Sequence, residues 1–133
     1  MPTLAKEIMS RDLLTARKGS TVEEIVKLFI HHRITGVPVL DARGKMIGVC
    51  SEYDLICQVA ESKKKDFQPF QKAIRFSRKV EAIDEDAPLS QIVRSFVDKK
   101  YRRLPVVDKK GKLVGIITRR DLMRVFFYQA KLG

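Results

Sequence analysis

The sequence has few of the residues from which catalytic and metal sites are built. Its 133 residues include two histidines, His31 and His32, and two cysteines, Cys50 and Cys57. The histidines are adjacent near the end of a predicted helix, so their side chains point in different directions and cannot form a two-ligand metal face. The cysteines form neither a zinc-type pattern nor a disulfide framework, and we expect reduced core residues. Without a Ser-His-Asp or Cys-His arrangement, a phosphate-cradling glycine loop or a carboxylate pair with obvious roles, the sequence predicts neither an enzyme nor a metal site.

Long hydrophobic segments are missing as well. No apolar run approaches the roughly 20 residues needed to cross a bilayer, and residues 1–18 contain no apolar core of a signal peptide. We therefore expect a cytoplasmic protein without a membrane partner. At 133 residues and 15.3 kDa, the chain is long enough to bury a sizeable core as one compact domain.

Acidic residues are scarce relative to basic ones. The 16 Asp and Glu residues stand against 27 Lys and Arg residues, which gives a formal net charge of +11 and a sequence pI near 9.9. Such a surface attracts nucleotide phosphates, nucleic acid or an acidic protein partner, and net charge alone does not choose among them. Any single basic cluster can also be a solvated surface that keeps the protein soluble.

The most informative feature that is present is an internal repeat. Residues 31–55 return, slightly changed, at residues 98–122, and a shift of 67 positions aligns them without a gap. The shift places Pro38 on Pro105 and Asp54 on Asp121. One unit has therefore been duplicated, and functional residues should come in pairs.

Hydrophobic patterning divides each unit into a helix, two strands and a second helix. One apolar helical face recurs at residues 22–30 and 89–97, after helix-start signals in Ser20-Thr21 and Asp86-x-Pro88. Strands are predicted at residues 36–40 and 46–50, and at 104–107 and 113–117, joined by hairpins with Gly44 or Gly111. The second strand of each hairpin is nearly all apolar, which predicts burial on both faces, and the prolines predict edge strands. Helices follow at residues 52–60 and 119–130.

A two-stranded sheet is only marginally stable alone, so we expect the two copies to pack face to face. The predicted fold is α/β (α+β), with two α-β-β-α repeats at residues 1–60 and 80–131. Residues 61–79 form a basic connector that also contains Phe67, Phe70 and Phe76. We expect a partly packed linker with a mobile tip at Ser62–Gln68. Basic residues interleaved with phenylalanines also fit a nucleic-acid surface.

The repeat resembles the cystathionine β-synthase (CBS) domain, whose units carry an apolar-Pro-Val-Asp strand, a Gly-bearing turn and a Gly-apolar-apolar-Ser/Thr-x-x-Asp motif. Here these motifs read Val37-Pro38-Val39-Leu40-Asp41 and Gly48-Val49-Cys50-Ser51-Glu52-Tyr53-Asp54 in the first copy. In the second copy they read Leu104-Pro105-Val106-Val107-Asp108 and Gly115-Ile116-Ile117-Thr118-Arg119-Arg120-Asp121. The resemblance covers about residues 1–131. It implies a tandem pair, the Bateman module, with pseudo-twofold symmetry and two clefts that in many relatives bind adenosine-containing ligands.

The resemblance also implies roles for individual residues. Ser51 and Thr118 would face a phosphate, and Asp54 and Asp121 would accept the ribose hydroxyls. The adenine would be flanked by apolar residues of the first strands and framed by a residue before the first helix, which here are Val37, Pro38, Leu104, Pro105 and Thr15. These roles agree with simple chemistry, because a helix N-terminus stabilises phosphate and a carboxylate can accept two hydroxyls.

An alternative needs no ligand. Ser or Thr followed three residues later by Asp also resembles a helix-capping arrangement, although Glu or Gln is the usual reciprocal partner. Gly48 and Gly115 favour the ligand interpretation, since a residue without a side chain lets a ligand approach the backbone closely.

The two copies differ in charge. The second contains Arg102, Arg103, Arg119 and Arg120, where the first has Thr35-Gly36 and Glu52-Tyr53. The second site should therefore bind anions more strongly. The Leu14-Thr15 pair of the first copy is replaced by Glu81-Ala82 in the second, which argues against base recognition there and leaves open a different ligand or none.

We accordingly expect a non-enzymatic regulatory sensor of AMP, ADP, ATP or S-adenosylmethionine that requires no cofactor. The alternatives are a basic nucleic-acid-binding protein and a ligand-free module for dimerisation or partner binding. The terminal run Val125-Phe126-Phe127-Tyr128 is explained most simply by core packing, and otherwise by the exposed interface of a homodimer.

Overall fold

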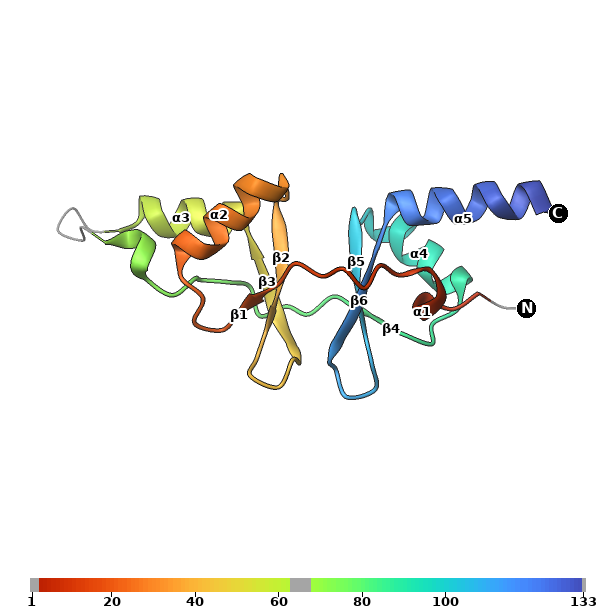
Figure 1. Ribbon diagram of the computed structural model, residues 1–133, viewed down its shortest axis with the longest axis horizontal. Helices are drawn as coiled ribbons and strands as arrows, with labels where there is room; N and C mark the ends of the chain where they lie inside the picture. The colour runs from red at the N-terminus through yellow and green to blue at the C-terminus, as the bar shows by residue number, and fades with distance from the viewer. Residues whose placement is uncertain (1–2, 63–67, 133) are drawn as a thin grey trace. The chain divides into compact units, whose positions relative to one another are not determined.

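The computed structural model describes residues 3–62 and 68–132 (Figure 1). The chain divides into two compact units, a first-repeat unit of residues 14–80 and a second-repeat unit of residues 1–13 and 81–133. Each unit has one three-stranded sheet accompanied by helices. The mixed α/β class and the duplicated architecture are thus confirmed.

The first-repeat unit contains β1 (Ala16–Arg17), α2 (Val22–His32), β2 (Gly36–Leu40), β3 (Met46–Ser51), α3 (Glu52–Ala60) and the 3-10 helix η1 (Pro69–Gln71). Its strand order is β1-β2-β3, with β1 parallel and β3 antiparallel to β2. The short strand β1 adds to the two strands that hydrophobic patterning predicted.

The second-repeat unit contains α1 (Ala5–Ile8), β4 (Ile83–Asp84), α4 (Leu89–Lys99), β5 (Arg103–Val107), β6 (Leu113–Thr118) and α5 (Arg119–Leu132). Its strand order, β4-β5-β6, repeats that of the first unit. The helix and strand bounds lie close to those expected from the hydrophobic pattern. The exceptions in this unit are the short strand β4 and the single-turn helix α1, which the pattern did not reveal.

The prediction that Pro38 and Pro105 lie on edge strands is wrong, because β2 and β5 are the central strands of their sheets. The physical reason is local. The short strand β1 pairs only with Val39 and Leu40 of β2, so Pro38 lies just before the paired stretch and has a sheet neighbour on one side only. Pro105 precedes the β4 pairing in the same way. The missing amide hydrogen therefore removes no ladder bond.

The hairpin turns are built by one aspartate in each repeat. Oδ1 of Asp41 accepts hydrogen bonds of 2.9 Å from the backbone amides of Arg43 and Lys45. Gly44 closes this turn with a φ of 83°, a left-handed conformation that glycine adopts without strain. The Lys45 amide is the main cause of a lowered pKa of Asp41. Asp108 repeats the arrangement in the second hairpin.

Each unit has its own hydrophobic core between its sheet and its helices. Ile25, Val39 and Leu55 belong to the core of the first unit, and Ile92 and Val106 to that of the second. Burial alternates along β3, where the odd-numbered residues are only half-buried. Burial along β6 alternates in the same way from Val114 to Thr118, so the expectation of a second strand buried on both faces is wrong in both repeats.

Both cores include a residue from a segment outside the helix-strand-strand-helix repeat. Ala5 of α1 belongs to the core of the second unit, and Ile74, from the predicted connector, belongs to the core of the first. The buried side chain of Gln58 holds this connector, since its Nε2 donates to the carbonyl of Ala73 and its Oε1 accepts from the amide of Arg75, both at 2.8 Å. Most of the predicted mobile tip at 62–68 lies outside the described residues.

Candidate functional site

The strand-to-helix junction of the first unit is closed by a reciprocal cap. Ser51 is the N-cap of α3, and its Oγ accepts a 3.1 Å hydrogen bond from the amide of Asp54. In return, Oδ2 of Asp54 accepts from both the amide and the hydroxyl of Ser51, at 2.9 Å each. Both side chains are half-buried.

The second unit repeats this cap at Thr118 and Asp121. Oδ2 of Asp121 accepts from the Thr118 amide at 2.7 Å and from its hydroxyl at 3.0 Å, and Thr118 Oγ1 accepts from the Asp121 amide at 3.3 Å. The other carboxylate oxygen, Oδ1, lies 3.6 Å from a guanidinium nitrogen of Arg124. Aspartate thus takes the reciprocal role that usually belongs to Glu or Gln.

The capping arrangement weighed as an alternative is therefore present in both units, and the two aspartates have a structural task without any ligand. The caps use only Oδ2 of each carboxylate. An ionised carboxylate has two oxygens with about four acceptor positions. Capping consequently does not consume the capacity of these aspartates to accept further hydrogen bonds.

The residues expected beside an adenine differ in accessibility. The side chains of Val37 and Leu104 are each 2% exposed and belong to the hydrophobic cores of their units. The neighbouring residues Pro38 and Pro105 are also buried, and adjacent side chains of a strand point to opposite faces. Thr15, directly before β1, is half-buried.

The position equivalent to Leu14 in the second unit is occupied by Glu81, and the structure explains this exchange. Glu81 forms a hydrogen bond with Tyr101, whose equivalent in the first unit is Ile34. Leu14 and Ile34 both pack against the first core. An apolar pair in one unit is thus replaced by a hydrogen-bonded pair in the other. Burial, followed by this contact with Glu81, raises the pKa of Tyr101 to about 12.

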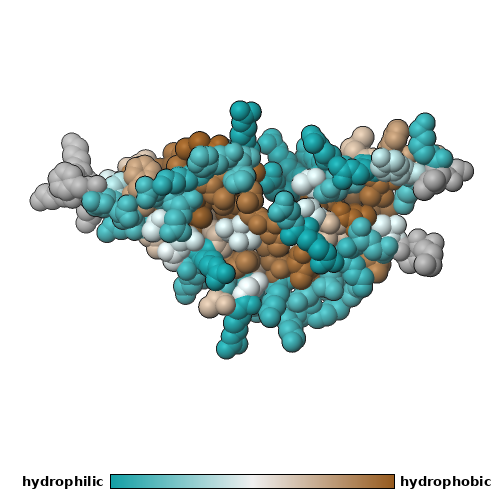
Figure 2. Space-filling model, in the orientation of Figure 1, coloured by the Kyte–Doolittle hydropathy of each residue, from teal (hydrophilic) through white to brown (hydrophobic). Residues whose placement is uncertain are grey.

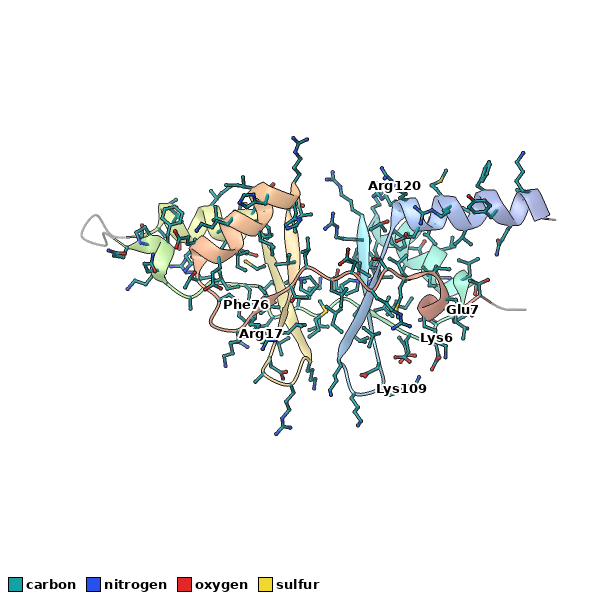
Figure 3. All side chains as sticks on the ribbon, viewed as in Figure 1. Lys6, Glu7, Arg17, Phe76, Lys109 and Arg120 are labelled. Atoms are coloured by element: carbon teal, nitrogen blue, oxygen red, sulfur yellow. The ribbon has the colours of Figure 1, made fainter. Side chains whose placement is uncertain are left out.

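The expectation that Gly48 and Gly115 leave room for a ligand is wrong. A Cβ on Gly48 would overlap the carbonyl oxygen of Ser77 and lie 2.8 Å from the ring of Phe76, which Figure 3 labels. A Cβ on Gly115 would overlap the side chain of Met9. Both glycines therefore accommodate another segment of the chain, which occupies the space that a ligand would need.

The four arginines of the second unit do not share one role. Arg119 donates from Nε to the carbonyl of Tyr101 at 2.8 Å and from a terminal guanidinium nitrogen to that of Lys100 at 2.9 Å. It thereby satisfies carbonyls at the end of α4. Arg102, Arg103 and Arg120 are exposed, and Arg120 lies in the first turn of α5 (Figure 3).

Asp121 also lines a cavity of about 360 Å³ between α1 and α5. Thr3, Glu7 and Ile8 contribute one side of it, and Arg124 and Tyr128 contribute to the other. Sequence reasoning missed the N-terminal residues because it assigned residues 1–60 to the first repeat. The backbone contacts that place them here are non-local, namely Leu4 with Pro88 and Ser10 with Ile116.

The simplest interpretation of the terminal aromatic run was packing in the core. The structure shows instead that its aromatic side chains are exposed. Phe126, Phe127 and Tyr128 are 43%, 57% and 57% exposed. They lie beyond Leu122, the last residue of α5 in the hydrophobic core, and the helix continues past the sheet (Figure 1). Figure 2 shows further hydrophobic surface over α2 and α3 of the first unit.

In the described ranges we find no reactive thiol at Cys50 and no group of side chains that could bind a metal ion. Cys50 is fully buried, and its Sγ donates to the carbonyl of Arg75 at 3.4 Å. Burial, together with the charge of Asp54, raises the pKa of this thiol to about 12, so it stays protonated at neutral pH. Residues 3–62 and 68–132 contain no group of three or more His, Cys, Asp and Glu side chains that could hold a metal ion. No helix within these ranges has the length and hydrophobicity to cross a membrane.

Known proteins that match most of this chain include two that are 34% and 33% identical to it. An uncharacterized protein of Methanopyrus kandleri, MK0525, is 34% identical over 119 residues, which cover 90% of this chain and 60% of the relative. The chloroplastic CBS domain-containing protein CBSX1 of Arabidopsis thaliana is 33% identical over 138 residues, which cover 85% of this chain and 58% of the relative. The chain thus spans about three fifths of the length of either relative.

Solved structures of similar fold include two CBS-pair proteins. CBSX2 in complex with AMP is 27% identical with a TM-score of 0.77, and the match covers 96% of this chain and 98% of that one. The CBS domain pair of MJ0100 in complex with 5'-methylthioadenosine and S-adenosylmethionine is 28% identical with a TM-score of 0.72, covering 97% and 99%. The CBS domain family matches residues 5–61 and 72–128. The chain therefore belongs to the CBS domain family and carries two CBS domains in tandem.

Proposed function

We propose that this chain is a non-enzymatic regulatory module of the cytoplasm that binds an adenosine-containing ligand at the Ser51–Asp54 and Thr118–Asp121 junctions. The observation that carries the proposal is that the two caps use the same atoms in both units and engage only Oδ2 of each aspartate. Similar CBS-pair proteins have been solved with AMP and with S-adenosylmethionine. A shared ligand chemistry explains why a duplicated chain keeps aspartate, rather than glutamate, at both positions.

The chemistry of each junction suits a ribose phosphate. Helices α3 and α5 begin at these junctions, and the positive end of each helix dipole stabilises a phosphate there. The amides of Glu52 and Arg119 already donate to the carbonyls of Thr35 and Arg102, and those of Asp54 and Asp121 donate to the caps. Oδ1 of Asp54 and Asp121 lies outside the cap and can accept hydrogen bonds from ribose hydroxyls. Because Val37 and Leu104 are core residues, we assign the contact with the base to Thr15 and to the proline-bearing faces of β2 and β5.

We expect the second junction to bind phosphate more tightly. Arg102, Arg103 and Arg120 are exposed near this end of the second unit, whereas the equivalent residues of the first unit are Thr35, Gly36 and Tyr53. Arg119 contributes less to phosphate binding than its position in the motif suggested, because its guanidinium already donates hydrogen bonds to carbonyls at the end of α4.

The test is isothermal titration of AMP, ADP, ATP and S-adenosylmethionine into the wild type and into Asp54→Asn and Asp121→Asn. The carboxamide keeps one oxygen for the cap and removes the negative charge. Loss of a hydrogen bond to a charged acceptor predicts about tenfold weaker AMP binding in Asp121→Asn, and a smaller loss in Asp54→Asn. Asp98→Asn, an exposed residue of α4, is the control. Unchanged affinity in Asp121→Asn refutes its assignment, and a wild type that binds none of the four compounds refutes the function.

We further propose that the module acts as a homodimer. Exposed apolar side chains occupy the outer helices of both units, among them Ile56 of α3 and Met123 of α5. Exposed apolar surface of this kind marks an interaction site, and isologous dimers are the commonest assembly. Ligand binding regulates such a dimer only through a difference in affinity between two of its states.

Nucleic-acid binding is the second candidate function, favoured by the exposed basic residues Lys99, Lys100, Arg102, Arg103 and Arg120. Salt separates the two candidates. Binding through several backbone phosphates weakens steeply with salt, whereas one nucleotide in a site depends on salt far less. Fluorescence anisotropy of a labelled oligonucleotide at two salt concentrations, with AMP as competitor, distinguishes them.

A further inference from the structure

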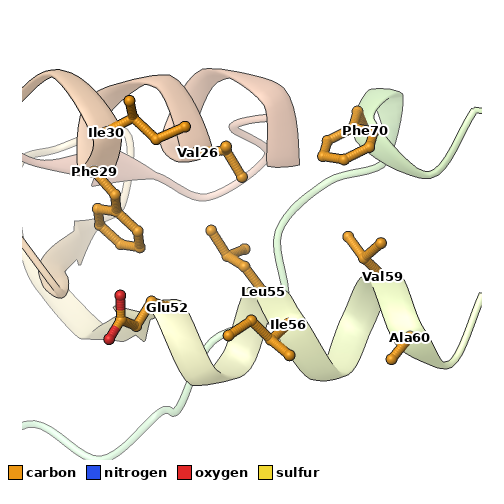
Figure 4. A pocket seen from close by; sticks show the side chains of 9 residues that line it. All are labelled: Val26, Phe29, Ile30, Glu52, Leu55, Ile56, Val59, Ala60 and Phe70. Carbon is orange, nitrogen blue, oxygen red and sulfur yellow. The ribbon is translucent and has the colours of Figure 1, made fainter.

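The two units carry cavities of different chemistry. The first-repeat unit has a groove of about 500 Å³ between α2 and α3, closed at one end by Phe70 of η1 (Figure 4). Its lining residues are apolar except for Glu52, so the groove offers a single charged side chain with which to orient a ligand. The cavity of about 360 Å³ between α1 and α5 of the second unit combines apolar walls with charged groups of both signs. This composition is typical of small-molecule sites.

The first repeat shows how the space between α1 and α5 can be closed. Three residues that line the cavity correspond, by the shift of 67, to polar residues of the first unit: Ile8 to Arg75, Val125 to Gln58 and Tyr128 to Glu61. There Gln58 binds the backbone of residues 73–75, and Arg75 forms an ion pair with Glu61. Isoleucine and valine cannot form these contacts. The space is therefore bridged in the first unit and open in the second, which distinguishes the cavity from the Ser/Thr-x-x-Asp junctions that both units share.

The wall that α1 contributes is fixed by backbone hydrogen bonds. The carbonyl of Thr3 accepts from the amide of Leu89 at 2.9 Å, and the amide of Ala5 donates to the carbonyl of Ala87 at the same distance. The side chain of Ala5 is buried in the core of the second unit. The cavity is thus formed within one unit by anchored elements, so little needs to be ordered when a ligand binds.

Three charged side chains line the cavity. Glu7, which Figure 3 labels on α1, accepts a 2.9 Å hydrogen bond from the amide of Leu4 at Oε1, and its Oε2 lies outside that cap. Arg124 lies 3.6 Å from Oδ1 of Asp121, and its guanidinium makes no hydrogen bond to any residue that the structure describes. Two carboxylates and one guanidinium give the cavity a formal charge of −1, in a chain whose net charge is +11.

This charge pattern selects among ligands. A nucleotide phosphate would meet two carboxylates for one guanidinium and is repelled. A simple amine would bind Glu7 and leave the donors of Arg124 without an anion, and a simple carboxylate would do the reverse. A zwitterion uses both residues, because a carboxylate can accept two parallel hydrogen bonds from a guanidinium. The remaining walls, which include Ile8, Val125 and the ring of Tyr128, suit an apolar side chain.

We infer that the cavity between α1 and α5 binds a free α-amino acid with an apolar side chain. Glu7 binds its ammonium group and Arg124 binds its carboxylate, while Asp121 orients the guanidinium. The inference adds a second class of ligand to the proposed adenosine-binding function and does not rest on it, since Asp121 makes no contact with the amino acid.

The test is isothermal titration of leucine, methionine and phenylalanine into the wild type, Glu7→Gln and Arg124→Gln. Glu7→Gln keeps an oxygen for the amide of Leu4 and removes the negative charge. Each variant should bind the three amino acids at least about tenfold more weakly than the wild type does. Glu24→Gln and Arg94→Gln make the same changes at exposed positions of α2 and α4 and should bind them like the wild type.

Two analogues of leucine separate the roles of the two residues from a loss of structure. Leucinamide has no carboxylate, so Arg124→Gln should bind it as the wild type does. Isocaproate has no ammonium group, so Glu7→Gln should bind it as the wild type does. A variant with a damaged fold would instead bind every compound more weakly. In nitrogen-15 NMR spectra of the wild type, leucine should shift the amide signals of Glu7 and Tyr128.

Four results would overturn the inference. They are a wild type that binds none of the three amino acids at about 10 mM, leucine affinity that is unchanged in either variant, leucinamide binding that falls with leucine binding in Arg124→Gln, and leucine-induced shifts that leave α1 and α5 unaffected. AMP titration of Glu7→Gln keeps this test separate from that of the adenosine sites, because this variant should bind AMP like the wild type. A wild type that binds leucine but no adenosine compound would refute the proposed function and leave the amino-acid site supported.

Discussion

Val49 and Ser77 exchange two backbone hydrogen bonds, each from the amide of one residue to the carbonyl of the other at 2.9 Å. Ile116 and Ser10 do the same in the second unit, at 2.9 and 2.8 Å. In each unit, a segment that lies upstream of the other repeat in the sequence thus pairs with the last strand of the sheet, which is β3 or β6. The glycine before Val49 or Ile116 is what allows the segment to approach so closely.

We predict that Gly48→Ala destabilises the protein more than Gly115→Ala. The new methyl group at Gly48 meets the backbone of Ser77, which is fixed by its two hydrogen bonds, whereas the one at Gly115 meets the flexible side chain of Met9. Overpacking of a fixed neighbour should cost about 3 kcal/mol, and displacement of a methionine about 1 kcal/mol. Urea denaturation of both variants measures the difference. Equal losses would mean that the Ser77 segment is free to move.

The sequence held a signal for these crossing segments that the motif-based interpretation did not use. The shift of 67 that defines the repeat also places Ser10 on Ser77 and Arg11 on Arg78, upstream of the predicted helices. Local hydrophobic periodicity predicted the main helices and the hairpins well, because these elements are determined by neighbouring residues. It could not tell which sheet the upstream segments join, since that is decided by contacts far apart in the chain.

Gln58 should be essential for attachment of residues 73–75 to the first unit. Replacement by leucine leaves the carbonyl of Ala73 and the amide of Arg75 without the partners that they have at 2.8 Å. The two hydrogen bonds are part-buried and Ala73 and Arg75 are exposed residues, so we expect a loss of about 1–3 kcal/mol in the free energy of unfolding. Gln91→Leu, on the exposed face of α4, is the matched control and should change it by less than about 0.5 kcal/mol. A mild loss in Gln58→Leu would mean that water replaces both bonds.

Arg119 and Arg120 are neighbours with different expected roles. Arg119→Ala removes two hydrogen bonds to the end of α4 and should lower the free energy of unfolding by about 1–2 kcal/mol. Arg120→Ala should leave stability nearly unchanged and weaken AMP binding, because this exposed residue is among those we assign to phosphate. Chemical denaturation and isothermal titration of both variants check the division. The assignment is wrong if Arg120→Ala binds AMP as the wild type does.

The sequence was sufficient to locate the candidate site at the two strand-to-helix junctions. It did not show that the same side chains also cap the helices. The Ser/Thr-x-x-Asp motif correctly placed Ser51 and Thr118 at helix N-termini. Only atomic distances reveal that each aspartate gives Oδ2 to the cap. Similarly, Arg119 was predicted as an anion ligand from its position in the motif, and its bonds to α4 depend on the backbone path 18 and 19 residues earlier. Sequence patterns identify a junction, whereas the division of its atoms between folding and binding is a property of tertiary structure.

The contact between Tyr101 and Glu81 predicts how stability depends on alkaline pH. Burial, and then the hydrogen bond and charge of Glu81, raise the pKa of Tyr101 from 10.0 to about 12. The folded state therefore holds the phenolic proton more tightly than the unfolded chain does. This contribution to stability is complete below pH 10 and is lost as the pH rises through about 12.

Tyr101→Phe removes it, so the wild type should lose more stability than this variant between pH 9 and 11.5. Lysines titrate in the same range in both proteins, and their effect cancels in the difference. Urea denaturation at closely spaced pH values, with Tyr128→Phe as an exposed control, measures the difference. Parallel pH profiles for the wild type and Tyr101→Phe would show that the phenol ionises alike in the folded and unfolded chains.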